Sequence, residues 1–266
     1  MLRLDQIHIY PIKSCAGIEL ESSPVHSRGF PLDRRWLLIE KDGKFISQRS
    51  TPSLGQIKIS SDNDHLLITA DGKRALNLQV GGASPSTIKA EIWKDSVEGW
   101  WVGQDCDDWF SDVIGREVHL IHMDESVSRP LIKESLPKDQ SFEVSFADGY
   151  PYLLTTLASL NDLNQRLEVP IPMDRFRSNL VISGSEAFAE DGWRKIAVGE
   201  VEFQVVKPCA RCQVTTIDQS SGIASKEPLK TLATYRKQDG KVMFGMNMVA
   251  LSSGTISIND PVKILS

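Results

Sequence analysis

Two cysteines three positions apart carry the strongest chemical signal in this sequence. Cys209 and Cys212 stand in the run KPCARCQVTTID, with Arg211 between them and Lys207 just before them. Nearby cations favour the thiolate over the thiol, and a thiolate can attack an electrophile, carry sulfur or bind a transition metal. The motif alone supports an equally good alternative, in which both cysteines are small buried apolar side chains.

Two other uses of paired cysteines are disfavoured. A thioredoxin-type pair opens a helix, whereas this pair lies between two segments of β-rich composition. A structural zinc site needs four ligands, while Cys15 and Cys106 are isolated and the five histidines show no ligand spacing near the pair. The sequence also contains neither a P-loop nor a Gly-x-Ser-x-Gly elbow, so it gives no support to a P-loop nucleotide enzyme or a serine hydrolase.

Cationic and hydroxyl side chains recur at the ends of predicted elements. Lys13 and Ser14 follow the first expected strand, Arg34 precedes the next, and Arg177 precedes a third. Such residues can hold a phosphate or another anion, although solvated surface charge is the better interpretation for any one of them. Thr156 stands at a predicted helix start, where capping is favoured over anion binding. Together these residues indicate a β-rich protein with a reactive thiolate and an anion site.

Composition narrows the class of protein. The 266 residues are 24% charged and 41% hydrophobic and carry a net charge of -5, which argues against a general nucleic-acid binder. The longest uncharged stretch, 242–259, is interrupted by polar residues and is too polar for a membrane span. Four cysteines and the lack of an apolar leader after Met1 lead us to expect a reducing, cytoplasmic location.

The hydrophobic pattern predicts mostly short strands. The clearest are rich in β-branched and aromatic residues and span 4–11, 35–40, 66–70, 118–122, 180–183, 201–206, 213–217 and 262–265. Three turn-and-strand phrases, at 114–120, 198–205 and 258–264, are typical of barrel or sandwich corners. Helices are expected from 105 to a cap at Gly115, over 155–167 and over 225–235. We therefore expect a mainly β fold with a few peripheral helices and two small β-barrels.

A polar segment without periodicity, 123–142, is the best candidate for a linker or surface loop. It divides the chain into two expected domains, 1–123 and 124–266.

Several separate motifs resemble a known family. The runs IYPIKSCAG (9–17) and LDRRW (32–36) are similar to the N-terminal β-barrel domain that precedes MOSC domains, named after the C-terminal part of molybdenum cofactor sulfurase. The runs that resemble the MOSC domain itself are FADGYP (146–151), LTTLASLN (154–161), RFRSN (175–179) and CARCQVTTID (209–218). The resemblance implies an N-terminal MOSC-associated β-barrel domain over 1–123 and a MOSC barrel over 124–266.

In this family, the members that reduce N-hydroxylated compounds include the mitochondrial amidoxime-reducing components, and they hold molybdenum on a pterin cofactor through one protein thiolate. The resemblance gives Cys212 that role, as metal ligand and catalytic residue. It gives the cofactor's phosphate and ring contacts to seven further residues: Lys13, Ser14, Arg34, Thr156, Arg177, Asn179 and Arg211. Asp148 and Asp218 also lie in matching motifs, but turn formation explains both equally well.

The resemblance thus implies a molybdenum–molybdopterin (Moco) oxidoreductase that removes the oxygen atom from small N-hydroxylated substrates, without pyridoxal phosphate. Because no cysteine follows Cys212, a four-cysteine iron–sulfur cluster has no place after it, and electrons are expected from a separate ferredoxin-like or flavoprotein-like donor. Neither a nucleic acid nor a membrane is expected as a partner. Two alternatives stay open: sulfur transfer through a persulfide on Cys212, and a cofactor carrier without turnover.

Overall fold

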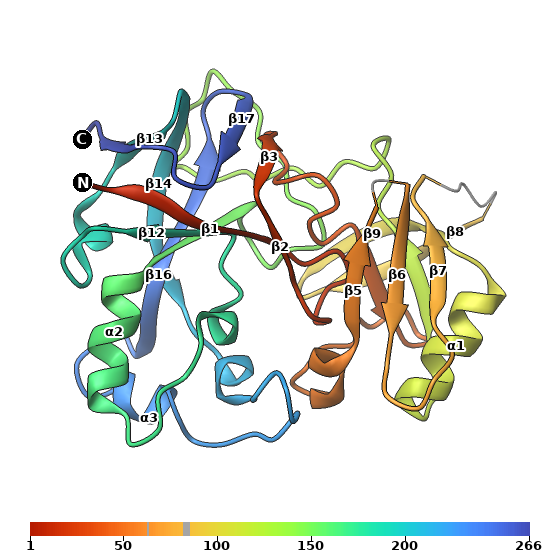
Figure 1. Cartoon of the computed structure of the whole chain (residues 1–266). Helices are drawn as coiled ribbons and strands as arrows, with labels where there is room; N and C mark the ends of the chain where they lie inside the picture. Colours follow the sequence, from red (N-terminus) through yellow and green to blue (C-terminus); the bar gives the residue numbers. More distant parts are fainter. Residues whose placement is uncertain (63, 82–85) are drawn as a thin grey trace.

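The strands of the molecule fall into two groups that lie side by side (Figure 1). The computed structural model describes residues 1–62, 64–81 and 86–266. One group contains the strands nearest both chain ends, and the other is built from residues between 36 and 122.

A nine-stranded sheet dominates the first group. Its order is β18-β13-β14-β16-β11-β12-β1-β2, and β15 pairs with β16 outside this order. The strands are β1 (Arg3–Ile9), β2 (Ile18–Leu20), β11 (Tyr152–Thr156), β12 (Leu180–Ser183), β13 (Lys195–Val198), β14 (Val201–Ala210), β15 (Lys237–Gln238), β16 (Lys241–Ala250) and β18 (Val262–Ile264). Neighbours on this path run antiparallel except β11 and β12, which are parallel. A separate antiparallel pair joins β3 (Ser22–Val25) to β17 (Gly254–Ser257).

Strand β16 lies in the middle of this sheet, between β14 and β11. Its run KVMFGMNMVA buries Phe244, Met246 and Met248 in the cores on either side. Gly245 has a φ of +76°, and a Cβ there would come within 2.6 Å of the Leu154 carbonyl oxygen on β11. Glycine therefore permits the close approach of these two strands at this point. The strands expected from the sequence do not include this central one.

Two smaller antiparallel sheets form the second group. The first has the order β4-β10-β9-β8, with β4 (Trp36–Ile39), β8 (Thr87–Ile92), β9 (Asp95–Trp101) and β10 (His119–His122). The second has the order β5-β6-β7, with β5 (Lys58–Ser61), β6 (His65–Thr69) and β7 (Leu76–Gln79). Along β6 the buried side chains alternate, as expected for a strand with one face on a core.

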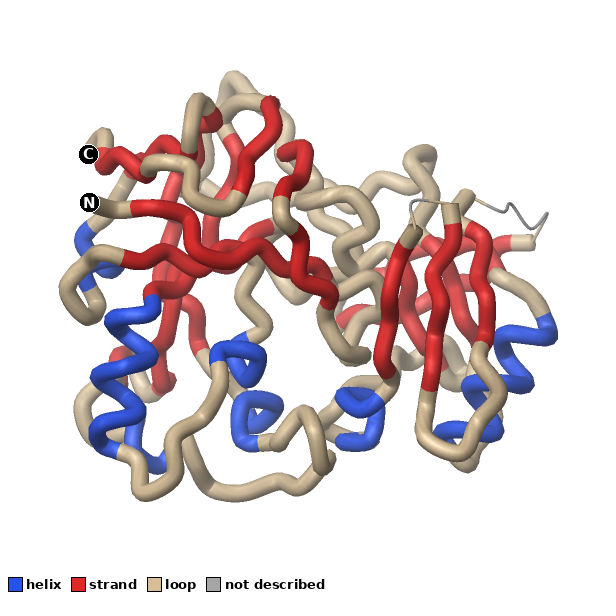
Figure 2. Tube along the Cα trace, viewed as in Figure 1, coloured by secondary structure: helices blue, strands red, loops and turns tan. Residues whose placement is uncertain are grey.

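Helices lie outside the strands (Figure 2). The α-helices are α1 (Gln104–Ile114), α2 (Leu157–Arg166) and α3 (Leu229–Leu232), and the 3-10 helices are η1 (Pro52–Gln56), η2 (Met173–Phe176), η3 (Ala189–Gly192) and η4 (Gln213–Thr216). Gly115 ends α1 with a φ of 77°, as the cap prediction requires. The mainly β fold with a few peripheral helices is confirmed. Among the described residues, no helix is both long enough and apolar enough to cross a membrane.

One predicted strand, 213–217, is wrong. The segment forms η4, in which the hydroxyls of Thr215 and Thr216 donate to the carbonyl oxygens of Cys212 and Gln213 at 3.0 and 2.7 Å. Threonine is common in strands, but its hydroxyl can also bond to the backbone three residues earlier and close a turn. The β-rich composition of this segment therefore did not decide its structure.

The polar segment 123–142 is packed against the protein rather than being a solvated linker. Leu131, Leu136 and Phe142 are buried in a cluster with Val249 of β16, and Arg129 is also buried, with only 5% of its surface exposed. Its apolar residues follow no helical or strand period, so the sequence pattern did not reveal their burial. The segment is an irregular connection that contributes to the core.

Strands from both ends of the sequence share one sheet. β1 pairs with β12 in the nine-stranded sheet, and β3 pairs with β17 in the separate two-stranded one, although residue 123 separates the members of each pair along the chain. The N-terminal strand also contacts the turn that precedes β18, since Leu4 N donates to Asp260 O at 2.9 Å. The nine-stranded sheet therefore contains strands from both sides of residue 123. A domain division near residue 123 stays a prediction.

Candidate functional site

One cavity is lined by residues from both halves of the chain. Seven of the eight residues predicted as a cofactor site lie on its wall: Lys13, Ser14, Arg34, Arg177, Asn179, Arg211 and Cys212. Further wall residues include Phe45, Arg49, Trp93, Asp148, Tyr150 and Cys209. Among the described residues, the wall thus carries five cations and one carboxylate. Such an excess of positive charge suits an anionic ligand.

The structure does not bring Thr156 to this cavity. Thr156 is buried at the N-terminus of α2, where its hydroxyl oxygen accepts from Ser159 N at 3.2 Å. The same hydroxyl lies 3.2 Å from the Glu190 carboxyl, which is also buried and accepts from Ser159 Oγ at 2.7 Å. Burial raises the pKa of Glu190, and the bond from Ser159 partly offsets this effect. Thr156 therefore caps a helix and anchors a buried carboxyl group.

The two cysteines of the pair lie where β14 gives way to η4. β14 ends at Ala210, and Cys212 is the residue that precedes the first turn of η4. The Cys212 carbonyl accepts from both N and Oγ1 of Thr215, at 3.1 and 3.0 Å. Both cysteines are free and half-buried, and both line the cavity. This short turn thus fixes the backbone that presents the Cys212 thiol.

The Arg211 guanidinium contacts the other cysteine. Its Nη1 donates to Cys209 Sγ at 3.1 Å, and its Nη2 donates to the Phe176 carbonyl oxygen at 2.6 Å. Its Nε is buried and has no hydrogen-bond partner among the described residues. A buried donor without a partner is uncommon, because desolvation then goes uncompensated. This atom fits a donor that is completed by a ligand.

Asn179 organises the back of the cavity. Its Oδ1 accepts from Arg34 Nη1 at 3.0 Å and from Leu153 N at 3.2 Å, while its Nδ2 donates to His8 O and Asp33 Oδ2, both at 3.1 Å. The whole hydrogen-bonding capacity of this amide is used within the protein. Asn179 therefore positions its neighbours, and Arg34 above all.

Three wall residues adopt left-handed backbone conformations. The φ angles are 74° at Ser14, 51° at Arg34 and 53° at Arg177. Non-glycine residues rarely take such conformations, and they are found most often where the surrounding structure imposes them at functional sites. The fold thus imposes a costly backbone at three of the predicted cofactor contacts.

Lys13 and Asp148 form an ion pair across the cavity. Lys13 Nζ lies 2.5 Å from Asp148 Oδ1 and donates to Phe146 O at 2.7 Å. Trp93 Nε1 donates to the same Asp148 oxygen at 3.1 Å. Burial lowers the pKa of Lys13, and the attraction of Asp148 partly offsets it. The Asp148 side chain is 66% exposed, so any loss of hydration that would raise its pKa is outweighed by the Lys13 charge and hydrogen bond, which hold that pKa well below its usual range.

One side of the cavity is formed by aromatic and cationic side chains that were not among the predicted site residues. Arg49 Cζ lies 4.1 Å from the centroid of the Trp93 ring, and Phe45 meets the same ring edge-on at 5.1 Å. Trp93 stands in the turn between β8 and β9 with a φ of 60°. Neither residue type nor spacing marks these positions, because Phe45 and Arg49 meet Trp93 only through tertiary contacts within residues 36–122.

Comparison with known proteins covers nearly the whole chain. Residues 1–117 match the family described as "MOSC N-terminal beta barrel domain", and residues 141–263 match the "MOSC domain". Human mitochondrial amidoxime-reducing component 1 is 34% identical over 98% of this chain and 82% of its own length. Rat mitochondrial amidoxime reducing component 2 is 34% identical over 97% of this chain and 82% of its own length. The chain belongs to the MOSC family. Rice molybdenum cofactor sulfurase is also 34% identical, over 92% of this chain and 32% of its own length.

The two MOSC-family regions contribute jointly to the cavity. Lys13, Ser14 and Arg34 lie in the range of the N-terminal family domain, whereas Arg177 and Cys212 lie in the range of the MOSC domain. The family resemblance expected from the sequence motifs is confirmed. A ligand bound in this cavity would contact both regions at once.

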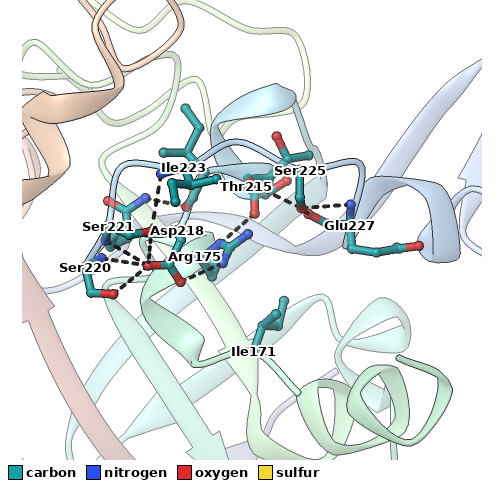
Figure 3. Close-up of polar contacts among 12 residues, drawn as sticks. Ile171, Arg175, Thr215, Asp218, Ser220, Ser221, Ile223, Ser225 and Glu227 are labelled. Atoms are coloured by element: carbon teal, nitrogen blue, oxygen red, sulfur yellow. Dashed lines mark hydrogen bonds and ion pairs between the residues drawn. The ribbon is translucent and has the colours of Figure 1, made fainter. Parts of the chain in front are cut away.

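The MOSC motif that contains the cysteines ends in a turn built by Asp218 (Figure 3). Asp218 Oδ1 accepts from the backbone N and the hydroxyl of both Ser220 and Ser221, at 2.5 to 3.1 Å. Its Oδ2 lies 3.3 Å from Nη1 of Arg175, which also donates from Nε to Thr215 O at 2.9 Å. The hydrogen bond from the Ser220 hydroxyl is the main cause that lowers the pKa of Asp218 to about 2. Asp218 therefore fixes the loop that follows η4.

Proposed function

We propose that this protein is a molybdenum-cofactor-dependent reductase of N-hydroxylated compounds. The observation that carries the proposal is the presence of the Cys212 thiol and five cationic side chains on the wall of one cavity. The relatives named as amidoxime-reducing components support the same class of reaction. In the overall change, one N–OH group takes up two electrons and two protons and yields N–H and water.

The donors of the cavity fit a pterin cofactor that carries molybdenum and a phosphate. Sulfur from Cys212 is the soft ligand that such a metal accepts. Arg177 and Arg211 offer planar guanidinium groups for phosphate oxygens. The unpartnered Nε of Arg211 supports this assignment, because an anion would complete its hydrogen bonding. When bound, the cofactor supplies the two-electron chemistry of the metal.

The wall residues divide into two roles in this proposal. Arg211 Nε is buried and has no partner within the described part of the chain, so we assign it, together with the Ser14 hydroxyl on the same wall, to direct cofactor contact. Arg34 is bound to Asp33, Asn179 and the Arg177 carbonyl oxygen. We assign Arg34 to shaping the electrostatics of the site and Asn179 to positioning Arg34.

The Lys13–Asp148 pair is the proposed proton-handling group of the cavity. Because its pKa is held low, Asp148 is a carboxylate at neutral pH and acts as an acceptor for an N–H or O–H of the substrate. Its Oδ1 is engaged by Lys13 and Trp93, which leaves Oδ2 for the substrate. Burial lowers the pKa of Lys13, so its ammonium group releases a proton more readily than a solvated lysine does.

The proposal includes a separate electron donor and a cellular location. Two electrons per turnover are proposed to come from a ferredoxin-like or flavoprotein-like protein. We place this protein in the cytoplasm because its few cysteines suit a reducing compartment. The names of its relatives place those proteins in mitochondria, and fractionation of the native cells would distinguish the two locations. Neither a nucleic acid nor a membrane is part of the proposed reaction.

Metal and pterin analysis tests the proposal directly. The full chain is purified from molybdenum-replete cells as wild type, Cys212→Ser and Cys209→Ser, and molybdenum and pterin are measured per chain. We expect Cys212→Ser to stay folded and to lose roughly tenfold or more of its molybdenum or of its reductase activity with an artificial reductant. Cys209→Ser is the matched control and is expected to be milder. A folded wild type without both molybdenum and pterin would refute the proposal.

Sulfur transfer is a second candidate function. Two thiols, Cys209 and Cys212, line the same cavity, and one relative is a molybdenum cofactor sulfurase. In that case Cys212 would carry a persulfide and the cationic wall would hold the acceptor. A persulfide detected on Cys212 without molybdenum would favour this function. Bound cofactor without any reduction by an artificial reductant would instead indicate a carrier.

A further inference from the structure

One buried aromatic ring contacts two arginines of the cavity at once. Tyr10 is 3% exposed and does not lie on the cavity wall. The Cζ atoms of Arg34 and Arg177 lie 4.4 and 4.2 Å from the centroid of its ring. Cations are attracted to the face of an aromatic ring, and more strongly where water is excluded. A single neutral side chain thus stabilises two like charges that both face the ligand cavity.

The two guanidinium groups need such a contact because they repel each other. Burial, together with the charge of Arg34, lowers the pKa of Arg177 to about 10. Asp33 supplies a counter-charge to Arg34, with Oδ2 at 2.5 Å from Nη1. Arg177 has a weaker anchor, since its Nη1 donates to the Cys15 carbonyl oxygen at 2.7 Å. The ring is therefore the contact that both arginines share.

The ring itself is held at both ends and along one edge. The backbone N of Tyr10 donates to Asp33 Oδ1 at 2.7 Å, and the Tyr10 hydroxyl donates to the Ser178 carbonyl oxygen at 3.2 Å. Gly17 leaves room for the ring edge, because a Cβ at Gly17 would come within 2.6 Å of Tyr10 Cε1. A methyl group at position 17 would thus displace the ring without removing it.

We propose that Tyr10 is the positioning residue of the anion site: its ring holds Arg177 where the guanidinium receives the phosphate of the cofactor, and it holds Arg34 beside it, where the second positive charge adds to the attraction. The inference deepens the proposed function and rests on it. Tyr10 acts through the two arginines and makes no contact with the ligand. Gly17 contributes to the same positioning because it makes space for the ring, although it too lies off the cavity wall.

Four variants of the full chain separate positioning from folding. Tyr10→Phe keeps the ring and removes the hydroxyl, Tyr10→Leu removes the ring, and Gly17→Ala displaces it. Leu is preferred to Ala because Tyr10 and Arg177 also line a second cavity, which a smaller residue would enlarge. The matched control is Tyr152→Leu, since Tyr152 is 1% exposed and, among the described residues, no cation lies over its ring.

Two readouts avoid reliance on enzyme activity. The first is the pterin content of protein purified from cofactor-producing cells. The second is the rise in melting temperature that inorganic phosphate causes in the full chain made without the cofactor, which reports binding to the folded state. We expect Tyr10→Leu and Gly17→Ala to weaken phosphate binding about tenfold and to lose most of the pterin, and Tyr10→Phe to stay within about twofold of wild type. Tyr152→Leu is expected to melt earlier but to keep its response to phosphate.

The outcomes distinguish this inference from the proposed function. If Tyr10→Leu binds phosphate and pterin as well as Tyr10→Phe does, the positioning role is overturned. If Tyr152→Leu loses phosphate binding to the same extent as Tyr10→Leu, the effect is general loosening and the inference fails as well. If wild type responds to phosphate but never contains pterin or molybdenum, the proposed function fails while the role of Tyr10 in the anion site stands.

Discussion

At the scale of single residues, hydrogen-bonding capacity separates side chains that shape the cavity from those that can receive a ligand. Asn179 uses all four of its hydrogen-bonding positions within the protein. Arg211 keeps one buried donor without a partner among the described residues, and Ser14 lies on the same cavity wall. The sequence motifs named all three as equal cofactor contacts. Their different roles depend on neighbours that are distant in sequence, such as His8 and Asp33 for Asn179.

His122 links the stability of the fold to pH. Its ring stacks on Trp36 with the centroids 4.6 Å apart. Burial, with a smaller contribution from Arg35, lowers the pKa of His122 from 6.5 to about 4. Between these two values the unfolded chain binds a proton that the folded chain excludes, so the free energy of unfolding falls as the pH falls.

Replacing His122 with Phe keeps an aromatic ring over Trp36 and removes this titration. We expect the free energy of unfolding of His122→Phe to drop less than that of wild type between about pH 7 and about pH 4.5, as measured by urea denaturation at both values. An equal drop in the two proteins would show that His122 is not responsible.

At the scale of elements, the turn that follows η4 depends on one carboxylate. Asp218 accepts four hydrogen bonds from Ser220 and Ser221 and faces Arg175 (Figure 3). We expect Asp218→Ala to lower the free energy of unfolding by about 1–2 kcal/mol at neutral pH, because these donors lose a charged acceptor that is partly screened by water. Chemical denaturation of the variant beside wild type measures this loss.

The stabilisation that the Asp218 carboxylate gives to the folded protein depends on pH. The folded-state pKa is lowered to about 2 from 3.8, so the stabilisation is complete above about pH 4 and disappears as the pH falls toward 2. The difference between wild type and Asp218→Ala is therefore expected to shrink over this acid range. A difference that stays constant down to about pH 2 would mean that the charge of Asp218 contributes nothing.

Elements with a strong local signal were predictable from the sequence, and those fixed by distant contacts were not. The helix before Gly115 and the helix behind Thr156 were recognised because their caps and apolar spacing are local. Strand β16 was missed because it is buried on both faces and shows no alternation. Segment 213–217 was assigned to a strand because its composition outweighed the backbone hydrogen bonds of Thr215 and Thr216.

The site itself was predicted from family motifs rather than from local pattern. Seven of the eight cofactor contacts that the family resemblance predicts line the cavity, whereas Thr156 faces Glu190 instead. Arg49 and Trp93 were not found, because Trp93 meets Asp148 only through the packing of the β8–β9 turn against the segment around residue 148, and Arg49 joins the site by stacking on Trp93. Such residues belong to the site through tertiary contacts that no short motif records.

At the scale of the whole molecule, the cavity depends on how the segment before Asp148 is held against the second group of strands. Arg129 links the two: its Nη2 lies 2.7 Å from Asp95 Oδ2 on β9, and its Nη1 donates to the carbonyl oxygens of Ser145 and Ala147 at 2.9 and 2.6 Å. Because Ala147 precedes Asp148, this buried guanidinium sets the backbone from which Asp148 reaches Lys13.

Removing Arg129 should therefore affect both stability and the site. Arg129→Met leaves two carbonyl oxygens without their donor, and we expect the free energy of unfolding to fall by about 2–4 kcal/mol. We also expect the molybdenum content to fall, because Asp148 and the cavity wall lose their support. The control is Arg28→Met: Arg28 pairs with Glu143 in the same connection but lies off the cavity wall. It should lower the unfolding free energy and leave the metal content near that of wild type. Equal loss of metal in the two variants would mean that the cavity responds to overall loosening and not to the Arg129 contacts.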